Sequence, residues 1–165
     1  MAEKNIYLDL DGVILDSEKL VVARKNDYPN LSWNEFFENL NWPKLLKESK
    51  EINSSVQIIK ELQKIKNCLL ILTKVHTLSE MQAKTIEIRE NRGIELPIIF
   101  VPPHFKKSQI VLPKDNELLI DDNINNINDW NANGGKGVLF TEKLENDVKN
   151  GIDTVNSLDF LLKLK

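Results

Sequence analysis

Residues 5–13 read NIYLDLDGV, and this stretch decides the fold prediction for the chain. The apolar run Asn5–Leu10 has the length and residue types of a buried strand. It carries Asp9 near its end, Asp11 follows, and Gly12 permits a sharp turn. Because side chains alternate along a strand, the two carboxylates are expected to point to one side. The stretch therefore predicts a buried strand that delivers two acids to one edge of a sheet.

Four further apolar runs have the same character: Leu69–Thr73, Pro97–Val101, Glu117–Ile120 and Gly137–Phe140. They are nearly continuous, which favours strands covered on both faces of a parallel sheet. Apolar residues at helical spacing lie between and after them, as in Val56, Ile59, Leu62 and Ile65; Leu78, Met81, Thr85 and Ile88; Ile124, Ile127 and Trp130; and Leu158, Leu161 and Leu162. The alternation predicts an α/β fold, a doubly wound three-layer sandwich with a parallel sheet of about five strands.

One connection in this pattern is long. Residues 17–66 carry two or three helical segments and most of the aromatic bulk of the chain. We expect them to form a small helical cap and a helix that returns to the core, while residues 1–16 and 67–165 form the core itself. Within the cap, Trp33, Phe36 and Phe37 are at helical spacing, which favours packing of the cap against itself or the core.

Composition narrows the class of protein. The chain has 165 residues, of which 41% are apolar, enough for one domain with a small insertion. A net charge of -3 argues against a partner that is polymeric nucleic acid. A lone cysteine, Cys68, excludes an internal disulfide and is interpreted as a small buried residue in a reducing compartment. No signal peptide and no apolar run of about 20 residues is evident, so we expect a cytoplasmic protein without a membrane partner.

A second pair of acids, Asp121 and Asp122, follows the run Glu117–Ile120. In doubly wound sheets the binding crevice lies beyond the carboxyl ends of the strands, where this pair would meet Asp9 and Asp11. Two such charges ~4 Å apart repel by about 4 kcal/mol at an effective dielectric near 20. Such a cluster requires a cation, and oxygen ligands with room for water favour Mg²⁺.

Four motifs, in order along the chain, resemble those of the haloacid dehalogenase (HAD) superfamily of phosphatases. They are Asp9-Leu10-Asp11-Gly12-Val13, Ile71-Leu72-Thr73, Lys107, and Leu119-Ile120-Asp121-Asp122. The resemblance covers nearly the whole chain outside the expected cap and implies a HAD-like fold with phosphatase activity.

For the carboxylates, the resemblance implies that Asp9 attacks phosphorus and forms an aspartyl-phosphate. Asp11 would protonate the leaving oxygen and then activate the water that hydrolyses the intermediate. The Asp9 side chain, the backbone carbonyl of Asp11 and the Asp121 side chain would hold Mg²⁺. Asp122 and Asn126 would lie just behind these ligands, with Asn126 in the place where the family often has a later acidic residue.

For the phosphate, the resemblance implies a hydrogen bond from Thr73, helped by the backbone at Lys74, and a lysine that neutralises charge. Both Lys106 and Lys107 are candidates for that lysine. We prefer Lys107, because Lys107–Ile110 is typical of the start of a short helix, the usual setting in the family.

Within the superfamily, the chain is most similar to the 5'(3')-deoxyribonucleotidase-like branch. The likeness rests on Leu118–Asp122, Asn126-Ile127, Gly134-Gly135 and the strand Gly137–Phe140. It implies a small phosphorylated substrate, a nucleoside monophosphate, with Phe36, Phe37 or Trp42 stacking on its base. His76 follows the second strand, and a solvated loop histidine is the simpler interpretation.

Other functions remain open on the sequence. A phosphatase for sugar phosphates or other small metabolites would differ only in the cap. A mutase would need a larger cap to exclude water, and a dehalogenase would not need Asp11. A binding protein on a HAD scaffold would be expected to lose Asp9, Asp11 or the acids after the fourth strand, and none of them is lost.

Overall fold

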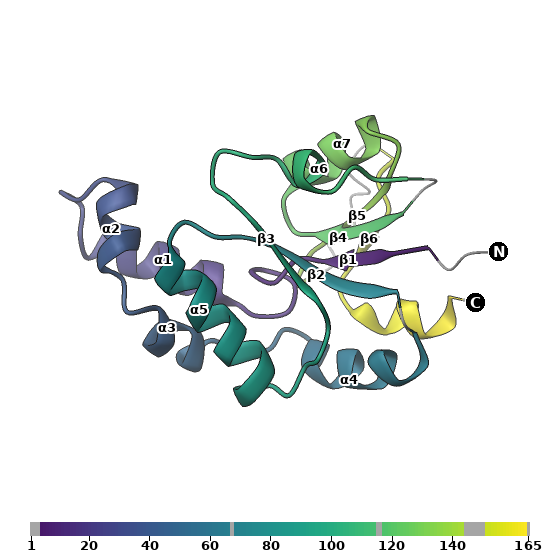
Figure 1. Ribbon diagram of the computed structural model, residues 1–165, viewed down its shortest axis with the longest axis horizontal. Helices are drawn as coiled ribbons and strands as arrows, with labels where there is room; N and C mark the ends of the chain where they lie inside the picture. Colours follow the sequence, from purple (N-terminus) through teal and green to yellow (C-terminus); the bar gives the residue numbers. More distant parts are fainter. Residues whose placement is uncertain (1–3, 67, 115–116, 144–150, 165) are drawn as a thin grey trace.

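The computed structural model describes residues 4–66, 68–114, 117–143 and 151–164, which form a parallel sheet with helices on both faces (Figure 1). The strands lie in the order β3-β2-β1-β4-β5-β6. Their bounds are Ile6–Leu8 (β1), Leu69–Lys74 (β2), Ile98–Val101 (β3), Leu118–Asp121 (β4), Lys136–Phe140 (β5) and Thr154–Val155 (β6). The α/β prediction and its five strands are confirmed. The sixth strand was missed because its two residues form no apolar run.

The strand register explains why the acids gather at one edge. The central strand β1 pairs with β2 and β4, and Leu8 lies level with Ile71 and Ile120. The backbone N–H of Asp9 still donates to the carbonyl of Ile120, at 2.9 Å. The first carboxylate therefore leaves the sheet beside the end of β4.

Apolar side chains pack on both faces of the sheet, as the continuous runs predicted. Ile6 and Leu8 face one side, where they join residues of α4 (Ser55–Ile65) and the 3-10 helix η2 (Leu158–Lys163). Tyr7 faces the other side and packs edge-on against Trp130 of α7 (Ile124–Ala132), with ring centroids 5.2 Å apart. The helix predicted from Leu158, Leu161 and Leu162 is thus present, as a 3-10 helix.

Four helices, rather than two or three, fill the long connection: α1 (Ser17–Asn26), α2 (Trp33–Asn39), α3 (Trp42–Glu48) and α4. A capping box starts α2, because Ser32 Oγ accepts from the N–H of Glu35 and the Glu35 carboxylate accepts from the N–H of Ser32. The first three helices lie beyond the end of the sheet, with α3 packed beside α5 (Leu78–Ile86) (Figure 1). They share a separate apolar cluster that includes Phe36, Trp42 and Leu45.

The predicted apolar face of α5 is only partly confirmed, because Ile88 at the end of that stripe is fully buried but the first residue is not. Leu78, assigned to the buried face, is 75% exposed, whereas Glu80, Lys84 and Glu87 are buried. The helix continues into a π-helical turn, η1 (Glu87–Asn91). The helix therefore buries charged side chains, and one of them, Lys84, reaches the carboxylate of Asp11.

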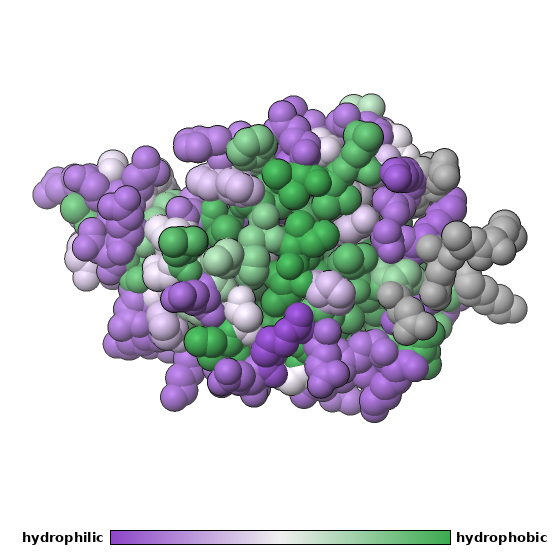
Figure 2. Space-filling model, in the orientation of Figure 1, coloured by the Kyte–Doolittle hydropathy of each residue, from purple (hydrophilic) through white to green (hydrophobic). Residues whose placement is uncertain are grey.

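The edge strand β3 is less covered than the central strands β1 and β4, and its residues 98–100 are only partly buried. Apolar side chains gather over the middle of the face shown in Figure 2. The described part of the connection between β3 and β4 contains the short helix α6 (Lys107–Ile110), which was predicted. No helix among the described residues is both long and apolar enough to cross a membrane.

Candidate active site

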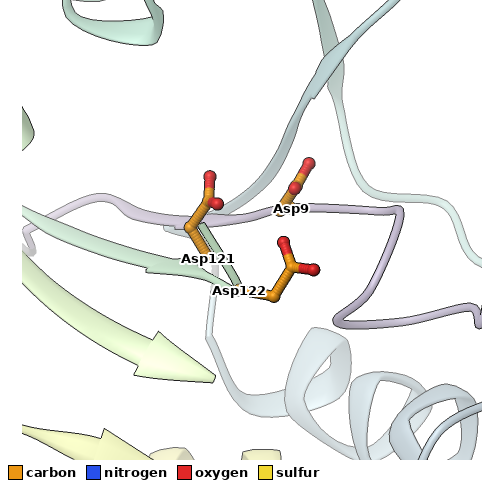
Figure 3. A group of neighbouring side chains, drawn as sticks. All are labelled: Asp9, Asp121 and Asp122. Carbon is orange, nitrogen blue, oxygen red and sulfur yellow. The ribbon is translucent and has the colours of Figure 1, made fainter. Parts of the chain in front are cut away.

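Three carboxylates gather beyond the ends of β1 and β4: Asp9, Asp121 and Asp122 (Figure 3). One oxygen of each lies within 4.8 Å of the others. The Asp121 carboxylate is fully buried and accepts hydrogen bonds from the backbone N–H of Asn123, at 2.9 Å, and from Asn126 Nδ2, at 3.1 Å to each oxygen. The sequence placed Asp122 behind the metal ligands, but its carboxylate belongs to the cluster.

Electrostatics make this cluster a place for a cation. Burial, together with the carboxylates of Asp121 and Asp11 and against the pull of Lys107, raises the pKa of Asp9 to about 7. Burial also raises the pKa of Asp122 to about 9, with Asp9 and a hydrogen bond to Glu18 as further causes. These raised pKa values mean that the grouped carboxyls do not all ionise readily unless a cation compensates their charge. Carboxylate oxygens in such a group fit Mg²⁺.

Gly12 is required beside this cluster for two reasons. Its φ of 81° is in the left-handed region that favours glycine. A Cβ at this position would also lie 2.0 Å from Oδ2 of Asp122. The glycine after the two acids therefore permits both the turn and the approach of the third carboxylate.

The lysine beside the cluster is Lys107, at the start of α6. Its buried Nζ lies 2.8 Å from Oδ1 of Asp9 and 2.6 Å from Oδ2 of Asp121. Burial would lower the pKa of this ammonium, but the two carboxylates outweigh it and raise the pKa. Lys106 is 66% exposed and pairs with Asp129 instead. The geometry thus favours Lys107 of the two candidates.

Asp11 points away from the cluster. Its Oδ1 accepts from Ser17 Oγ at 2.6 Å, and its Oδ2 accepts from Thr73 Oγ1 at 3.2 Å and from Lys84 Nζ at 2.6 Å. Burial favours the neutral acid, but Lys84 and these hydrogen bonds lower the pKa of Asp11 below its ordinary value. With the side chain occupied in this way, a metal role of Asp11 stays a prediction for its backbone carbonyl alone.

Lys84 and Glu80, both on α5, were missed by the sequence reasoning. The side chains are 1% and 2% exposed, and Lys84 Nζ lies 2.8 Å from Glu80 Oε1. An acid and a lysine four residues apart on a helix ordinarily indicate a solvent-exposed pair. No local signal in the sequence marks this pair as buried.

A cavity of about 400 Å³ adjoins these groups. On one side it is bounded by Asp9, Asp11, Asp122 and Lys107, and by Lys74 and His76 after Thr73. Apolar residues of α1–α3 form the other side: Val21, Val22, Trp33, Phe37 and Trp42. The acids therefore open onto a space with an aromatic wall.

Two of the three aromatic residues proposed for the substrate line this cavity. The Phe37 ring stacks on His76, with centroids 3.8 Å apart and planes at 17°, and lies parallel to Trp42 at 6.0 Å. Phe36 is not part of the wall, because it turns into the helical layer and packs against Tyr28 and Trp33. His76 lies in the exposed loop after β2, as the simpler interpretation expected, and its ring also stacks on Phe37 and lines the cavity.

Comparison with known proteins identifies the type of fold. No family model matches the chain, and no curated protein sequence is significantly similar to it. Solved structures do match over nearly their whole length. A haloacid dehalogenase-like hydrolase from Streptococcus pneumoniae has a TM-score of 0.62 at 14% identity, with 98% of each chain covered.

Two further structures have the same architecture. D,D-heptose 1,7-bisphosphate phosphatase from Burkholderia thailandensis has a TM-score of 0.60 at 15% identity, covering 96% of this chain and 99% of its own. A HAD hydrolase from Bacillus subtilis bound to magnesium has a TM-score of 0.64 at 13% identity, covering 99% and 98%. The fold is therefore HAD-like. At these identities the likeness establishes the fold and leaves activity to the site.

Proposed function

We propose that this protein is a phosphatase of the HAD superfamily, a magnesium-dependent phosphomonoester hydrolase whose nucleophile is Asp9. The observation that carries the proposal is the position of Asp9, which shares a buried cluster with Asp121 and Asp122 while Lys107 contacts it at 2.8 Å. The cavity beside the cluster gives a phosphate ester access to Asp9. HAD hydrolases and phosphatases among the structural neighbours support the same class of reaction.

The side chains of Asp9 and Asp121 would hold Mg²⁺, with the backbone carbonyl of Asp11 as a third ligand and Asp122 beside them. Bound there, the ion would neutralise the repulsion between the phosphate and the carboxylates and hold the reacting groups in line. Lys107 would neutralise charge shared by Asp9 and the phosphoryl group. Mg²⁺ in a structural neighbour and the carboxylate donor set support this assignment.

In the first half of the reaction, a carboxylate oxygen of Asp9 forms a bond to phosphorus as the bond to the alcohol oxygen breaks. Asp11 gives the leaving oxygen its proton. Lys84 and the hydrogen bonds from Ser17 and Thr73 lower the pKa of Asp11, so Asp11 is charged in the substrate-free protein and must take up a proton from solvent before it can give one to the leaving oxygen. In the second half Asp11 takes a proton from water as that water hydrolyses the aspartyl-phosphate.

Phosphate would be held by the Thr73 hydroxyl and the backbone at Lys74, at the end of β2. Residues 17–66 would form the cap and the return helix, and residues 1–16 and 67–165 the catalytic core. We place this reaction in the cytoplasm, as the sequence suggested.

For the substrate we propose a nucleoside monophosphate. The cavity of about 400 Å³ is of the size that small-molecule sites have, and Trp33, Phe37 and Trp42 give it an aromatic wall. Stacking on such a wall suits a base better than a sugar. A sugar phosphate is the second candidate, supported by the heptose bisphosphate phosphatase among the neighbours.

The test is phosphate release, with and without Mg²⁺, from ribo- and deoxyribonucleoside 5'- and 3'-monophosphates, sugar phosphates and p-nitrophenyl phosphate. We expect Mg²⁺-dependent turnover that Asp9→Asn abolishes, with a nucleoside monophosphate preferred. Preference for a sugar phosphate would overturn the substrate proposal and leave the chemistry intact. Mg²⁺ binding to the folded protein without turnover of any of these esters would favour a binding protein on this fold.

A further inference from the structure

Lys84 is a buried ammonium that the proposed reaction does not yet use. Its Nζ has four neighbours: Asp11 Oδ2 at 2.6 Å, Glu80 Oε1 at 2.8 Å, the carbonyl of Lys74 at 2.8 Å and Thr73 Oγ1 at 3.3 Å. With its side chain 1% exposed, this ammonium has exchanged water for these partners. Lys107, the other buried lysine of the site, contacts Asp9 and Asp121 instead of Asp11.

Glu80 holds this lysine in place. Its Oε2 accepts from the backbone N–H of His76 at 2.7 Å and lies 3.1 Å from His76 Nδ1, while Oε1 contacts Lys84. The carboxylate is thus fixed at both oxygens. Burying an acid and a lysine costs desolvation free energy. Replacing such a buried ion pair by apolar residues often leaves the stability of the fold unchanged or increases it. Stability alone therefore gives little reason for a buried acid and lysine at this position.

The partners of Lys84 give a functional reason. A general acid must lie within about 2.6–3.2 Å of the atom it protonates, so its orientation matters as much as its chemistry. Ser17 and Thr73 supply neutral hydrogen bonds to Asp11, and Lys84 supplies the charged one, which is about twice as strong. Burial would lower the pKa of Lys84, but Asp11 and Glu80 outweigh it and raise the pKa, so the ammonium stays charged.

We propose that Lys84, fixed by Glu80, is a positioning residue that holds the Asp11 carboxylate beside Thr73 in the orientation from which it acts on the leaving oxygen. This inference rests on the proposed function, because it takes Asp11 as the acid and base of that reaction. Lys84 itself touches neither substrate nor metal in this account. The effect of Lys84 on the rate should therefore depend on how much the reaction needs proton transfer by Asp11.

That dependence gives the test, which compares kcat/KM of Lys84→Met on two substrates in Mg²⁺. A nucleoside 5'-monophosphate leaves as an alkoxide and needs a proton, whereas p-nitrophenolate leaves without one. Since kcat/KM covers the steps up to the phosphoryl-enzyme, the shared hydrolysis of the intermediate does not enter the comparison. We expect a loss on the order of 10²-fold on the nucleotide, the lower end of what a positioned acid supplies, and a few-fold loss at most on the aryl ester.

Two variants separate positioning from folding. Lys84→Met leaves Glu80 buried without its cation, so Glu80→Gln with Lys84→Met removes both charges and is expected to keep the same selective loss. The exposed Lys64→Met on α4 is the matched control and should behave as wild type. Equal losses on both esters, no loss on the nucleotide, or recovery of wild-type kcat/KM in the double variant would each overturn the proposal.

Failure of the proposed function looks different. If wild type hydrolyses neither ester, or Asp9→Asn remains active, the phosphatase proposal falls and this inference falls with it. If wild type hydrolyses both esters and Asp9→Asn hydrolyses neither, the chemistry stands and the variants at Lys84 decide the inference alone.

Discussion

Two buried lysines contact different aspartates of the site. Lys107 starts the short helix α6 and contacts Asp9 and Asp121, next to the three-carboxylate cluster. Lys84 projects from α5 and contacts Asp11 and Glu80, away from that cluster. The same side-chain type therefore serves two ends of one reaction: Lys107 neutralises charge where phosphorus is attacked, and Lys84 orients the group that moves the proton.

The largest effect expected from this comparison is at Lys107. Lys107→Met should lower kcat/KM on the order of 10³-fold, as loss of one preorganised charge contact does, and equally on nucleotide and p-nitrophenyl esters. Lys106→Met is the adjacent control and should change neither, because that side chain is 66% exposed. Steady-state kinetics on both esters would measure this. A loss confined to one leaving group would contradict the distinction drawn between Lys107 and Lys84.

The cluster side should also respond to pH where the Lys84 side does not. Burial raises the pKa of Asp9 to about 7 and that of Asp122 to about 9, so at pH 7 the metal-free cluster retains protons that Mg²⁺ must displace. The apparent affinity for Mg²⁺ should therefore rise between pH 6 and pH 9, by up to about tenfold per pH unit for each proton displaced. Calorimetric titration in two buffers of different ionisation enthalpy would detect the released protons, and binding without proton release would contradict this account.

Stability of the metal-free protein should follow the same groups. A carboxyl whose folded pKa is raised stabilises the fold below the unfolded value of 3.8, and this contribution is lost as pH rises through about 7 and about 9. In a chelator, Tm should therefore fall from pH 6 to pH 9, and saturating Mg²⁺ should restore part of the loss. Asp122→Asn should flatten the dependence in thermal melts, and an unchanged slope would remove Asp122 from the cluster's titration.

The aromatic wall should give smaller effects than either lysine. Trp33→Ala should raise KM for a nucleoside monophosphate about tenfold, because Trp33 lines the cavity with 48% of its surface exposed and stacking on a base is worth about 1–3 kcal/mol, and should leave KM for p-nitrophenyl phosphate less affected. Phe36→Ala is the paired comparison, because Phe36 packs within the helical layer and should lower Tm without a selective change in KM. A thermal melt beside each kinetic measurement separates the two outcomes.

The smallest expected effect is at Leu78, which the predicted apolar stripe of α5 includes but which is exposed in the structure. Leu78→Ser should change the free energy of unfolding by no more than about 0.5 kcal/mol, because the side chain is 75% exposed. Ile88→Ala, a fully buried position of the same predicted stripe, should cost about 2–5 kcal/mol. Denaturant unfolding of the two variants would contradict the observed burial if Leu78→Ser were the costlier change.

The same two lysines show what could and what could not be predicted from the sequence. Lys107 was assigned to the site through its resemblance to the third motif of the HAD superfamily, at the start of a short helix, whereas the meeting of the acids follows from parallel strands that end at one edge. Lys84 was assigned no role, because a charged residue on a helix is ordinarily solvated and its burial depends on what the helix packs against. In the same way, the spacing of Trp33, Phe36 and Phe37 predicted packing but did not say which ring would face the cavity.

The central claim is that Asp9 becomes phosphorylated, and acid quenching during turnover tests it most directly. Wild type would be mixed with Mg²⁺ and its best substrate, quenched within one turnover, and digested for mass spectrometry. The account predicts an acid-stable, hydroxylamine-sensitive phosphoryl group on the peptide that contains Asp9, absent from Asp9→Asn. Phosphate on another residue, or full turnover with no phosphorylated Asp9 at any quench time, would contradict it.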